Sequence, residues 1–399
     1  MRILIDMTSV QPANGIQTNG GGEYAYRIFY ELLQNVHESI REIHVMLSQK
    51  KGKNVKTLRL CQEFHIVLKY YSNLTEFEDV INNGNYEKIF FPVCYPEYSE
   101  MKINRNLKVI AVIHDLSLMQ ELMIEKRSNA YMIRNIKGFF RHMFVIFFGN
   151  IFVRELKEKH RQLFNLSDYM KIITVSYYSR NVMEFLLEKK VDYVLYTPSK
   201  KRIYEYDTDE KNILKKLNVE EDKYFLLINA SRWLKNNLRV IKVLDRLFST
   251  SVLENLHNMK VLVCGITPKY LSFYQKKIKN KNHFILTDFV EEEELEVLYK
   301  NAFAFVFPSL LEGFGMPPSE ALKYETMCLC STSTSLPEIY RDSVIYFEPE
   351  NDTSIAVSVT SLFDIEYVNM VRKRIHYCTQ MLREKQEHDL KKICEMILE

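Results

Sequence analysis

The 399-residue sequence has little glycine, little net charge and no long apolar run. Its formal net charge is +3, which gives no reason to expect nucleic acid as a partner. The longest apolar stretch, residues 143–153, is interrupted by Gly149 and Asn150. It is far shorter than the roughly 20 residues that cross a bilayer, so we expect no transmembrane helix.

Cysteine is also sparse. Seven cysteines, an odd number, are scattered from Cys61 to Cys394, which fits a reducing compartment better than a disulfide framework. Cys328 and Cys330 fall on a predicted strand and are interpreted as small core residues. The chain begins Met-Arg-Ile-Leu-Ile-Asp, without the apolar stretch of a secretory signal peptide. We therefore expect a cytoplasmic protein.

Patterns for metal and nucleophilic chemistry are missing as well. No group of Cys and His has zinc-ligand spacing, and no G-x-S-x-G motif supports Ser–His–Asp catalysis. The triplet Asp207-Thr-Asp209 resembles acidic sites for Mg²⁺ or Mn²⁺, but no apolar strand precedes it. We interpret it as solvated and predict no metal site.

Short apolar strands alternate with amphipathic helices along the chain, a pattern typical of parallel α/β sheets. A polar, charge-dense interval separates two such series. The predicted strands are residues 3–5, 43–47, 88–91, 109–113 and 172–175, then 225–228, 261–264, 284–286, 304–307, 328–330 and 344–347. We predict two doubly wound, Rossmann-like domains facing a central cleft. Their bounds are 1–198 for the first, 199–222 for an interdomain linker, 223–375 for the second, and 376–399 for a C-terminal helix.

The most informative segment runs from Pro308 to Ala321 and joins a buried strand to a helix with proline in its first turn. Ligands of open α/β sheets bind at the carboxyl ends of the strands, where helix N-termini favour phosphate. Glu312 lies on the loop and Glu320 in the first helical turn, so both carboxylates suit the vicinal hydroxyls of a sugar or a ribose. The alternative is that Glu312 is solvated and Glu320 complements the helix dipole.

Six of the eleven glycines follow apolar strands or lie in strand-to-helix loops, where backbone approaches a ligand or adopts positive φ. They are Gly20, Gly21, Gly22, Gly265, Gly313 and Gly315. The first three precede the first predicted helix, where their N–H groups suit an anion. Their spacing does not match a dinucleotide-binding fingerprint, and a flexible linker explains them equally well.

Two cations and a histidine follow predicted strands. Arg232 and Lys235 open a helix, where positive charge opposes the dipole unless an anion lies between them. This favours a diphosphate ligand, with a solvated pair as the alternative. His114 directly follows the strand 109–113, where it is placed to meet a substrate hydroxyl or to be an ordinary loop histidine.

Residues 126–161 combine nine Lys or Arg with many phenylalanines. Such a segment suits an anionic membrane surface. Alternatively, its apolar face packs inside the first domain while its basic residues stay in water. The sequence leaves both readings open.

Taken with Ser331-Thr-Ser-Thr-Ser-Leu-Pro-Glu338, the segment 308–321 resembles family 4 retaining glycosyltransferases of the GT-B fold. The resemblance covers most of the second domain and is thinner in the first. It also implies that the C-terminal helix, residues 376–399, crosses back to the first domain. It includes Arg232-Trp-Leu-Lys-Asn, Cys264-Gly265, Val290-Glu-Glu-Glu-Glu-Leu, Tyr299-Lys-Asn-Ala, Gly20–Gly22, His114-Asp115 and Thr174-Val-Ser-Tyr-Tyr-Ser179.

This resemblance implies a role for each candidate residue. Glu312 would contact the donor sugar, Glu320 the ribose hydroxyls, and His114 the sugar. Arg232 and Lys235 would bind the donor diphosphate without a metal ion. The remaining expected donor-binding positions are Gly313, Phe314, Gly315, Met316, Gly265, Gly20, Gly21 and Gly22.

The resemblance implies transfer of a hexose-type sugar from a UDP- or GDP-linked donor to a glycan or lipid-linked acceptor, in bacterial surface-polysaccharide synthesis. An epimerase or phosphorylase of the same fold and a non-catalytic nucleotide-sugar-binding subunit are the alternatives. The chain departs from the family pattern in two places. Glu325 stands where a glycine is common after the second Glu helix, and Leu234 stands directly before Lys235-Asn236, where the family often has the arginine.

Overall fold

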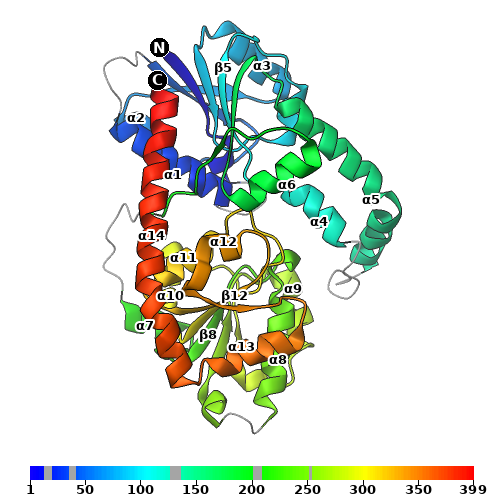
Figure 1. Cartoon of the computed structure of the whole chain (residues 1–399), viewed down its shortest axis with the longest axis vertical. Helices are drawn as coiled ribbons and strands as arrows, with labels where there is room; N and C mark the ends of the chain where they lie inside the picture. Colours follow the sequence, from blue (N-terminus) through cyan, green and yellow to red (C-terminus); the bar gives the residue numbers. More distant parts are fainter. Residues whose placement is uncertain (13–19, 36–41, 126–135, 201–208, 251–253) are drawn as a thin grey trace. The chain divides into compact units, whose positions relative to one another are not determined.

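The computed structural model describes residues 1–12, 20–35, 42–125, 136–200, 209–250 and 254–399. The chain divides into two compact units (Figure 1). Unit 1 comprises Met1–Met119, Asn150–Lys201 and Glu384–Glu399, and unit 2 comprises Gln120–Gly149 and Arg202–Arg383. The sequence-based boundaries did not anticipate that residues 120–149 group with unit 2.

Unit 1 is built on a seven-stranded parallel sheet of order β3-β2-β1-β4-β5-β6-β7. Its strands are β1 Arg2–Asp6, β2 Glu42–Ser48, β3 Val67–Tyr71, β4 Lys88–Phe91, β5 Lys108–Val112, β6 Tyr169–Thr174 and β7 Tyr193–Val194. The helices of this half of the chain are α1 Gly20–Gln34, α2 Val55–Glu63, α3 Leu74–Asn83, α4 Ser117–Glu125, α5 Ile136–Leu163 and α6 Tyr177–Leu187.

Unit 2 is built on a six-stranded parallel sheet of order β10-β9-β8-β11-β12-β13. Its strands are β8 Tyr224–Leu227, β9 Lys260–Val263, β10 Phe284–Leu286, β11 Ala304–Phe307, β12 Met327–Ser331 and β13 Ile345–Phe347. The helices are α7 Glu210–Lys216, α8 Asn237–Phe248, α9 Pro268–Gln275, α10 Glu292–Asn301, α11 Met316–Leu322, α12 Leu336–Tyr340, α13 Asp352–Ser361 and α14 Ile365–Leu398.

The central strands are apolar because helices cover both faces of a parallel sheet. Every residue of β4, β8, β11 and β12 is buried. Cys328 and Cys330 lie fully buried on β12, as expected of core residues. All seven cysteines are free.

The polar interval predicted as a linker contains a helix, α7. Asp209 accepts a hydrogen bond from the Asn212 N–H at the start of this helix. Two ion pairs join α7 to α10, one between Lys216 and Glu294 and one of 2.7 Å between Lys300 and Glu210. The charges of this interval therefore hold a helix on unit 2.

Helix α14 is continuous and contributes to both units (Figure 1). Its last third docks on unit 1 through buried polar contacts. Gln386 Nε2 donates to the Thr197 carbonyl at 2.6 Å, and Asp389 Oδ2 accepts the Tyr196 N–H at 2.8 Å. Lys88 Nζ, from β4, donates to the carbonyls of Met396 and Ile397 at 2.9 and 3.0 Å. The lysine thereby satisfies carbonyls that the helix end leaves unpaired.

Candidate functional site

The order of the unit 2 sheet reverses between β8 and β11, which are hydrogen-bonded neighbours. In open α/β sheets, ligands bind at the carboxyl ends of the strands at such a switch point. The loop after β8 carries Arg232 and Lys235, and the loop after β11 carries Glu312. The Leu310 N–H donates to the Leu234 carbonyl at 2.8 Å, which ties the two loops together.

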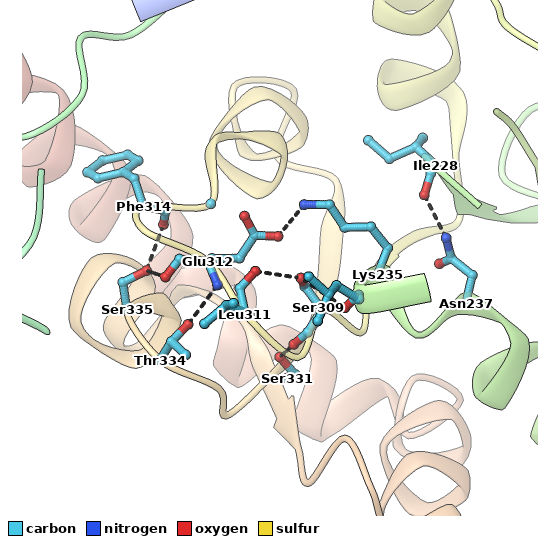
Figure 2. Close-up of polar contacts among 12 residues, drawn as sticks. Ile228, Lys235, Asn237, Ser309, Leu311, Glu312, Phe314, Ser331, Thr334 and Ser335 are labelled. Atoms are coloured by element: carbon cyan, nitrogen blue, oxygen red, sulfur yellow. Dashed lines mark hydrogen bonds and ion pairs between the residues drawn. The ribbon is translucent and has the colours of Figure 1, made fainter. Parts of the chain in front are cut away.

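Lys235 and Glu312 form an ion pair at this switch point (Figure 2). The side chains are only 9% and 13% exposed. The Lys235 ammonium also lies 4.9 Å from the centroid of the Phe307 ring, a cation–π contact. The two residues are 77 positions apart in the sequence but in contact in the structure. The prediction that both side chains serve one site requires such contact.

Hydroxyl groups hold the Glu312 loop in shape (Figure 2). The Glu312 N–H donates to Thr334 Oγ1 at 3.1 Å. The Ser335 hydroxyl lies 3.2 Å from the carbonyls of both Glu312 and Phe314. The Ser331 hydroxyl donates to the Ser309 carbonyl at 2.5 Å. The segment Ser331–Ser335 thus acts as a support for the loop, a role that the sequence signalled only through its density of Ser and Thr.

Gly315 marks the point where the loop turns into α11. Its φ is +84°, a conformation that favours glycine, and a Cβ there would lie 2.5 Å from Leu336 Cδ2, so that any other residue would also displace this leucine side chain. The Tyr340 hydroxyl donates to the Gly315 carbonyl and accepts the Ser319 N–H. Gly313 and Phe314, just before it, are buried, and Met316 is the first helical residue.

Glu320 lies half-buried on α11, one turn beyond Gly315. Its neighbour is the buried Tyr299 of α10. Burial, and after it the charge of the Glu320 carboxylate, raises the pKa of Tyr299 well above its ordinary value. Tyr299 is therefore a neutral phenol beside a carboxylate. The reading of Glu320 as a ribose contact stays a prediction.

Arg232 and Lys235 differ in their surroundings. Arg232 is exposed, just before the 3₁₀ turn Trp233–Lys235, whereas Lys235 is buried. Between them, the Trp233 indole N–H donates to Glu121 Oε1 at 3.0 Å. Asn236 ends the turn with a φ of +54° and donates through Nδ2 to the Pro349 carbonyl at 2.8 Å. This tryptophan contact was not predicted, because it joins positions 112 residues apart.

Gly265 follows β9 beside the same edge. Its φ is +80°, and a Cβ there would lie 3.1 Å from the Asn229 backbone. Its N–H donates to the Asp288 carbonyl, and its carbonyl accepts the Ser231 N–H, each at 2.9 Å. Gly265 therefore allows the loop after β9 to meet the loop after β8 closely.

The first-domain glycines lie within α1 rather than before it. Gly20, Gly21 and Gly22 are the first three residues of the helix. A Cβ on Gly22 would lie 2.6 Å from the Ser9 carbonyl oxygen, so glycine lets α1 pack against the 3₁₀ turn Thr8–Val10. This correction gives Gly22 a packing reason that the sequence pattern did not distinguish from ligand approach.

His114 follows β5 in unit 1 and is oriented by two neighbours. Its Nε2 lies 2.9 Å from the Pro92 carbonyl, and its ring meets Tyr24 edge-on at 4.5 Å. Because a carbonyl only accepts, Nε2 carries the proton and Nδ1 of the neutral ring is an acceptor. Burial lowers the pKa of His114, which favours this neutral form.

A buried carboxylate that sequence analysis missed ends β1. Asp6 accepts the Thr8 N–H at 3.0 Å and the Tyr98 hydroxyl at 2.7 Å. Burial raises the pKa of Asp6, although these hydrogen bonds act in the opposite direction. Lys51 Nζ donates nearby to the Thr8 carbonyl at 3.1 Å. The sequence feature that could have pointed to Asp6 is an acidic residue directly after the first apolar run.

Among the described residues, no three or more His, Cys, Asp or Glu side chains are grouped as metal ligands would be. Asp209 caps α7, and Asp207 lies outside the described residues.

Solved structures align with nearly the full length of the chain. WaaG, a glycosyltransferase involved in lipopolysaccharide biosynthesis, aligns with a TM-score of 0.66 at 13% identity, covering 99% of both chains. The fold is GT-B. Anabaena HepE in complex with UDP-glucose aligns with a TM-score of 0.65 at 13% identity, over 100% of this chain and 99% of that one. At such identity these likenesses establish the GT-B fold alone.

Sequence comparisons agree on the second half of this GT-B chain. Residues 209–380 match the family model described as glycosyl transferases group 1. The chain is 32% identical over 139 residues to the O-antigen chain mannosyltransferase RfbU of Salmonella typhimurium. It is 30% identical over 155 residues to an uncharacterized glycosyltransferase of Methanocaldococcus jannaschii. These alignments cover 34% and 37% of this chain and 37% and 38% of the relatives' own lengths.

Proposed function

We propose that the chain is a retaining glycosyltransferase that transfers a hexose from a nucleotide diphosphate sugar to a glycan or lipid-linked acceptor in bacterial surface-polysaccharide synthesis. The observation that carries this proposal is the buried pair of Lys235 and Glu312 at the switch point of a GT-B fold. The match of residues 209–380 to glycosyl transferases group 1 supports it, because both side chains lie inside the matched segment.

The donor diphosphate is the partner that fits the loop after β8. Lys235 supplies a buried point charge, and the exposed Arg232 adds a guanidinium fork from the same loop. Negative charge grows on the diphosphate as the sugar departs, so fixed cations beside it stabilise the transition state. Backbone N–H groups of residues 313–316 add to this stabilisation, and the reaction proceeds without a metal ion.

The two carboxylates then bind hydroxyl groups. A diphosphate that bonds to Lys235 frees Glu312 to accept hydrogen bonds from the donor sugar. Glu320 accepts those of the ribose. His114, with its proton fixed on Nε2 by the Pro92 carbonyl, accepts a sugar hydroxyl at Nδ1. The acceptor attacks either from the face of the departing diphosphate or through a short-lived ion pair, and both routes retain the anomeric configuration.

Several relatives carry names that suggest the first donor to test. RfbU and a second relative, from Escherichia coli, are named O-antigen chain mannosyltransferases. HepE has been solved with UDP-glucose. GDP-mannose is therefore the first donor to test, and UDP-glucose is the second. Slow donor hydrolysis, in which water replaces the acceptor, gives a readout before the acceptor is identified.

The decisive experiment removes the charges of the buried pair. We expect the double variant Lys235→Met/Glu312→Gln to lose about 100-fold or more of transfer and hydrolysis activity, because both transition-state contacts are gone. Changing both residues avoids leaving one buried charge unpaired, which costs about 3–5 kcal/mol of stability. The matched control is Lys300→Met/Glu210→Gln, which removes an exposed Lys–Glu pair of the same unit and should leave activity within about twofold.

Thermal unfolding of both variants shows whether the fold is kept, and a nucleotide-sugar should stabilise the wild type but not the site variant. Near-normal turnover in the site variant would contradict the assignment. Donor binding without turnover would indicate a non-catalytic subunit. Conversion of the donor to an isomeric nucleotide-sugar, with neither an acceptor nor water consumed, would indicate an epimerase.

A further inference from the structure

Helix α5 presents a line of large apolar side chains to solvent. Phe140, Phe144, Phe147 and Ile151 recur at the i, i+4, i+7 and i+11 spacing of one helical face. They are 66%, 49%, 69% and 63% exposed, and Phe148 beside them is also exposed. These five residues form the α5 stripe. It lies on a single continuous helix.

The opposite face of α5 is packed. His142 and Val145 are buried, as is Gly149, and toward the end of the helix so are His160 and Leu163. The stripe is therefore the outward face of a docked helix. The reading in which these phenylalanines pack in the first domain is not what the structure shows. A contiguous exposed apolar patch of this kind marks an interaction surface.

The charge of the sequence that contains the stripe selects the partner. From Lys126 to Arg154 the sequence contains six Lys or Arg and no Asp or Glu. Acidic residues return only at Glu155, and beyond it Lys159 pairs with Glu100 at 2.9 Å and Arg161 with Glu188 at 2.8 Å. A second copy of the chain would bring the same positive charge against this face. An anionic partner is favoured instead.

We propose that the α5 stripe binds a membrane surface that contains anionic lipid. A row of exposed aromatic side chains, in a stretch of sequence rich in Lys and Arg, enters the boundary between headgroups and acyl chains without needing a complementary pocket. The helix lies on the surface and does not cross it. Its apolar part, residues 139–153, is about 22 Å long, against about 30 Å of bilayer hydrocarbon. No helix in the described part of the chain is long and apolar enough to span a membrane.

The test is co-sedimentation of the full chain with phosphatidylcholine vesicles, with and without phosphatidylglycerol. We expect binding only when phosphatidylglycerol is present. It should weaken at high salt, because the screening length falls from about 10 Å at 0.1 M to about 3 Å at 1 M. Phe140→Ser/Phe147→Ser should lower the vesicle partition coefficient about tenfold or more. The control Val55→Ser/Tyr377→Ser changes equally exposed residues of α2 and α14 and should bind like wild type.

The charge is tested by Arg154→Gln, an exposed position on α5, which should reduce binding and its salt dependence. Absence of binding at every salt concentration would overturn the proposal. So would a wild-type dimer in sedimentation that Phe140→Ser/Phe147→Ser converts to monomers without any vesicle binding. The measurement needs no turnover, so its failure is separate from that of the proposed transferase activity. Donor hydrolysis in Phe140→Ser/Phe147→Ser should be unchanged and confirms that the variant is folded.

Discussion

Lys235 and Glu312 neutralise each other where little water reaches either side chain. The sequence predicted that both belong to one site, since each lies in a loop between a strand and the helix that follows it. It did not predict that they bond to each other, because that depends on the neighbouring positions of β8 and β11 in the sheet. Arg232 and Lys235 were predicted as a pair, and only the structure shows that one is exposed and the other buried.

His114 makes a pH prediction at the scale of a single residue. Its pKa in the folded protein lies below the ordinary 6.5 because burial disfavours the charged ring. As pH falls through 6.5, the unfolded chain binds a proton that the folded chain resists, so His114 lowers stability in acid. We expect the wild type to lose more stability than His114→Gln between about pH 8 and about pH 5.5, by up to about 1.4 kcal/mol per unit of pKa difference.

Urea unfolding of both proteins at the two pH values measures this difference, and the other buried groups cancel in the comparison. If the free energy of unfolding of the wild type instead rose relative to that of His114→Gln as the pH falls, the folded protein would favour the imidazolium.

At the scale of elements, the strands were the most predictable part of the fold. Each of the eleven predicted strands overlaps an observed one, because a strand covered on both faces is a continuous apolar run. The missed strands, β3 and β7, lie at the two edges of the unit 1 sheet. β3 is mostly part-exposed, and β7 has two residues, so neither leaves an apolar run.

The exit from α11 shows how the chain manages without the usual glycine. Glu325 adopts a φ of +57°, a left-handed conformation that is unfavourable for residues with a Cβ. We expect Glu325→Gly to raise stability by about 0.5–1 kcal/mol by relieving this strain. The urea midpoint checks the gain.

The control is Glu325→Ala, which also removes the exposed 3.9 Å contact with His376 but keeps the Cβ. Equal midpoints for the two variants would mean that the backbone at this position is not strained.

At the scale of the whole molecule, the sequence predicted two α/β units, and the family resemblance implied a C-terminal helix that returns to the first, but neither gave the contacts that hold α14. The buried Asp389 accepts the Tyr196 N–H and is paired with Lys385 at 2.6 Å. We expect Asp389→Ala to destabilise this docking by about 2–4 kcal/mol, because it leaves a buried N–H and an ammonium without their acceptor. Amide hydrogen exchange in residues 384–398 should then become faster.

Asp389→Asn keeps an acceptor for the Tyr196 N–H and should show a smaller effect. Exchange as slow as wild type in the alanine variant would mean that apolar packing alone holds this part of α14. Such long-range polar contacts cannot be read from the sequence, since they join residues almost 200 positions apart.

Trp233 is the single tryptophan of the chain and lies two positions before Lys235. Its indole N–H donates a hydrogen bond to Glu121. Indole emission responds to the polarity and hydrogen bonding of its surroundings. The indole emission of this protein therefore originates from one residue, in the loop that carries Lys235. A ligand that engages Lys235 has an unlabelled optical reporter already in place, and Glu121→Gln alters that reporter while leaving Lys235 and Glu312 as they are.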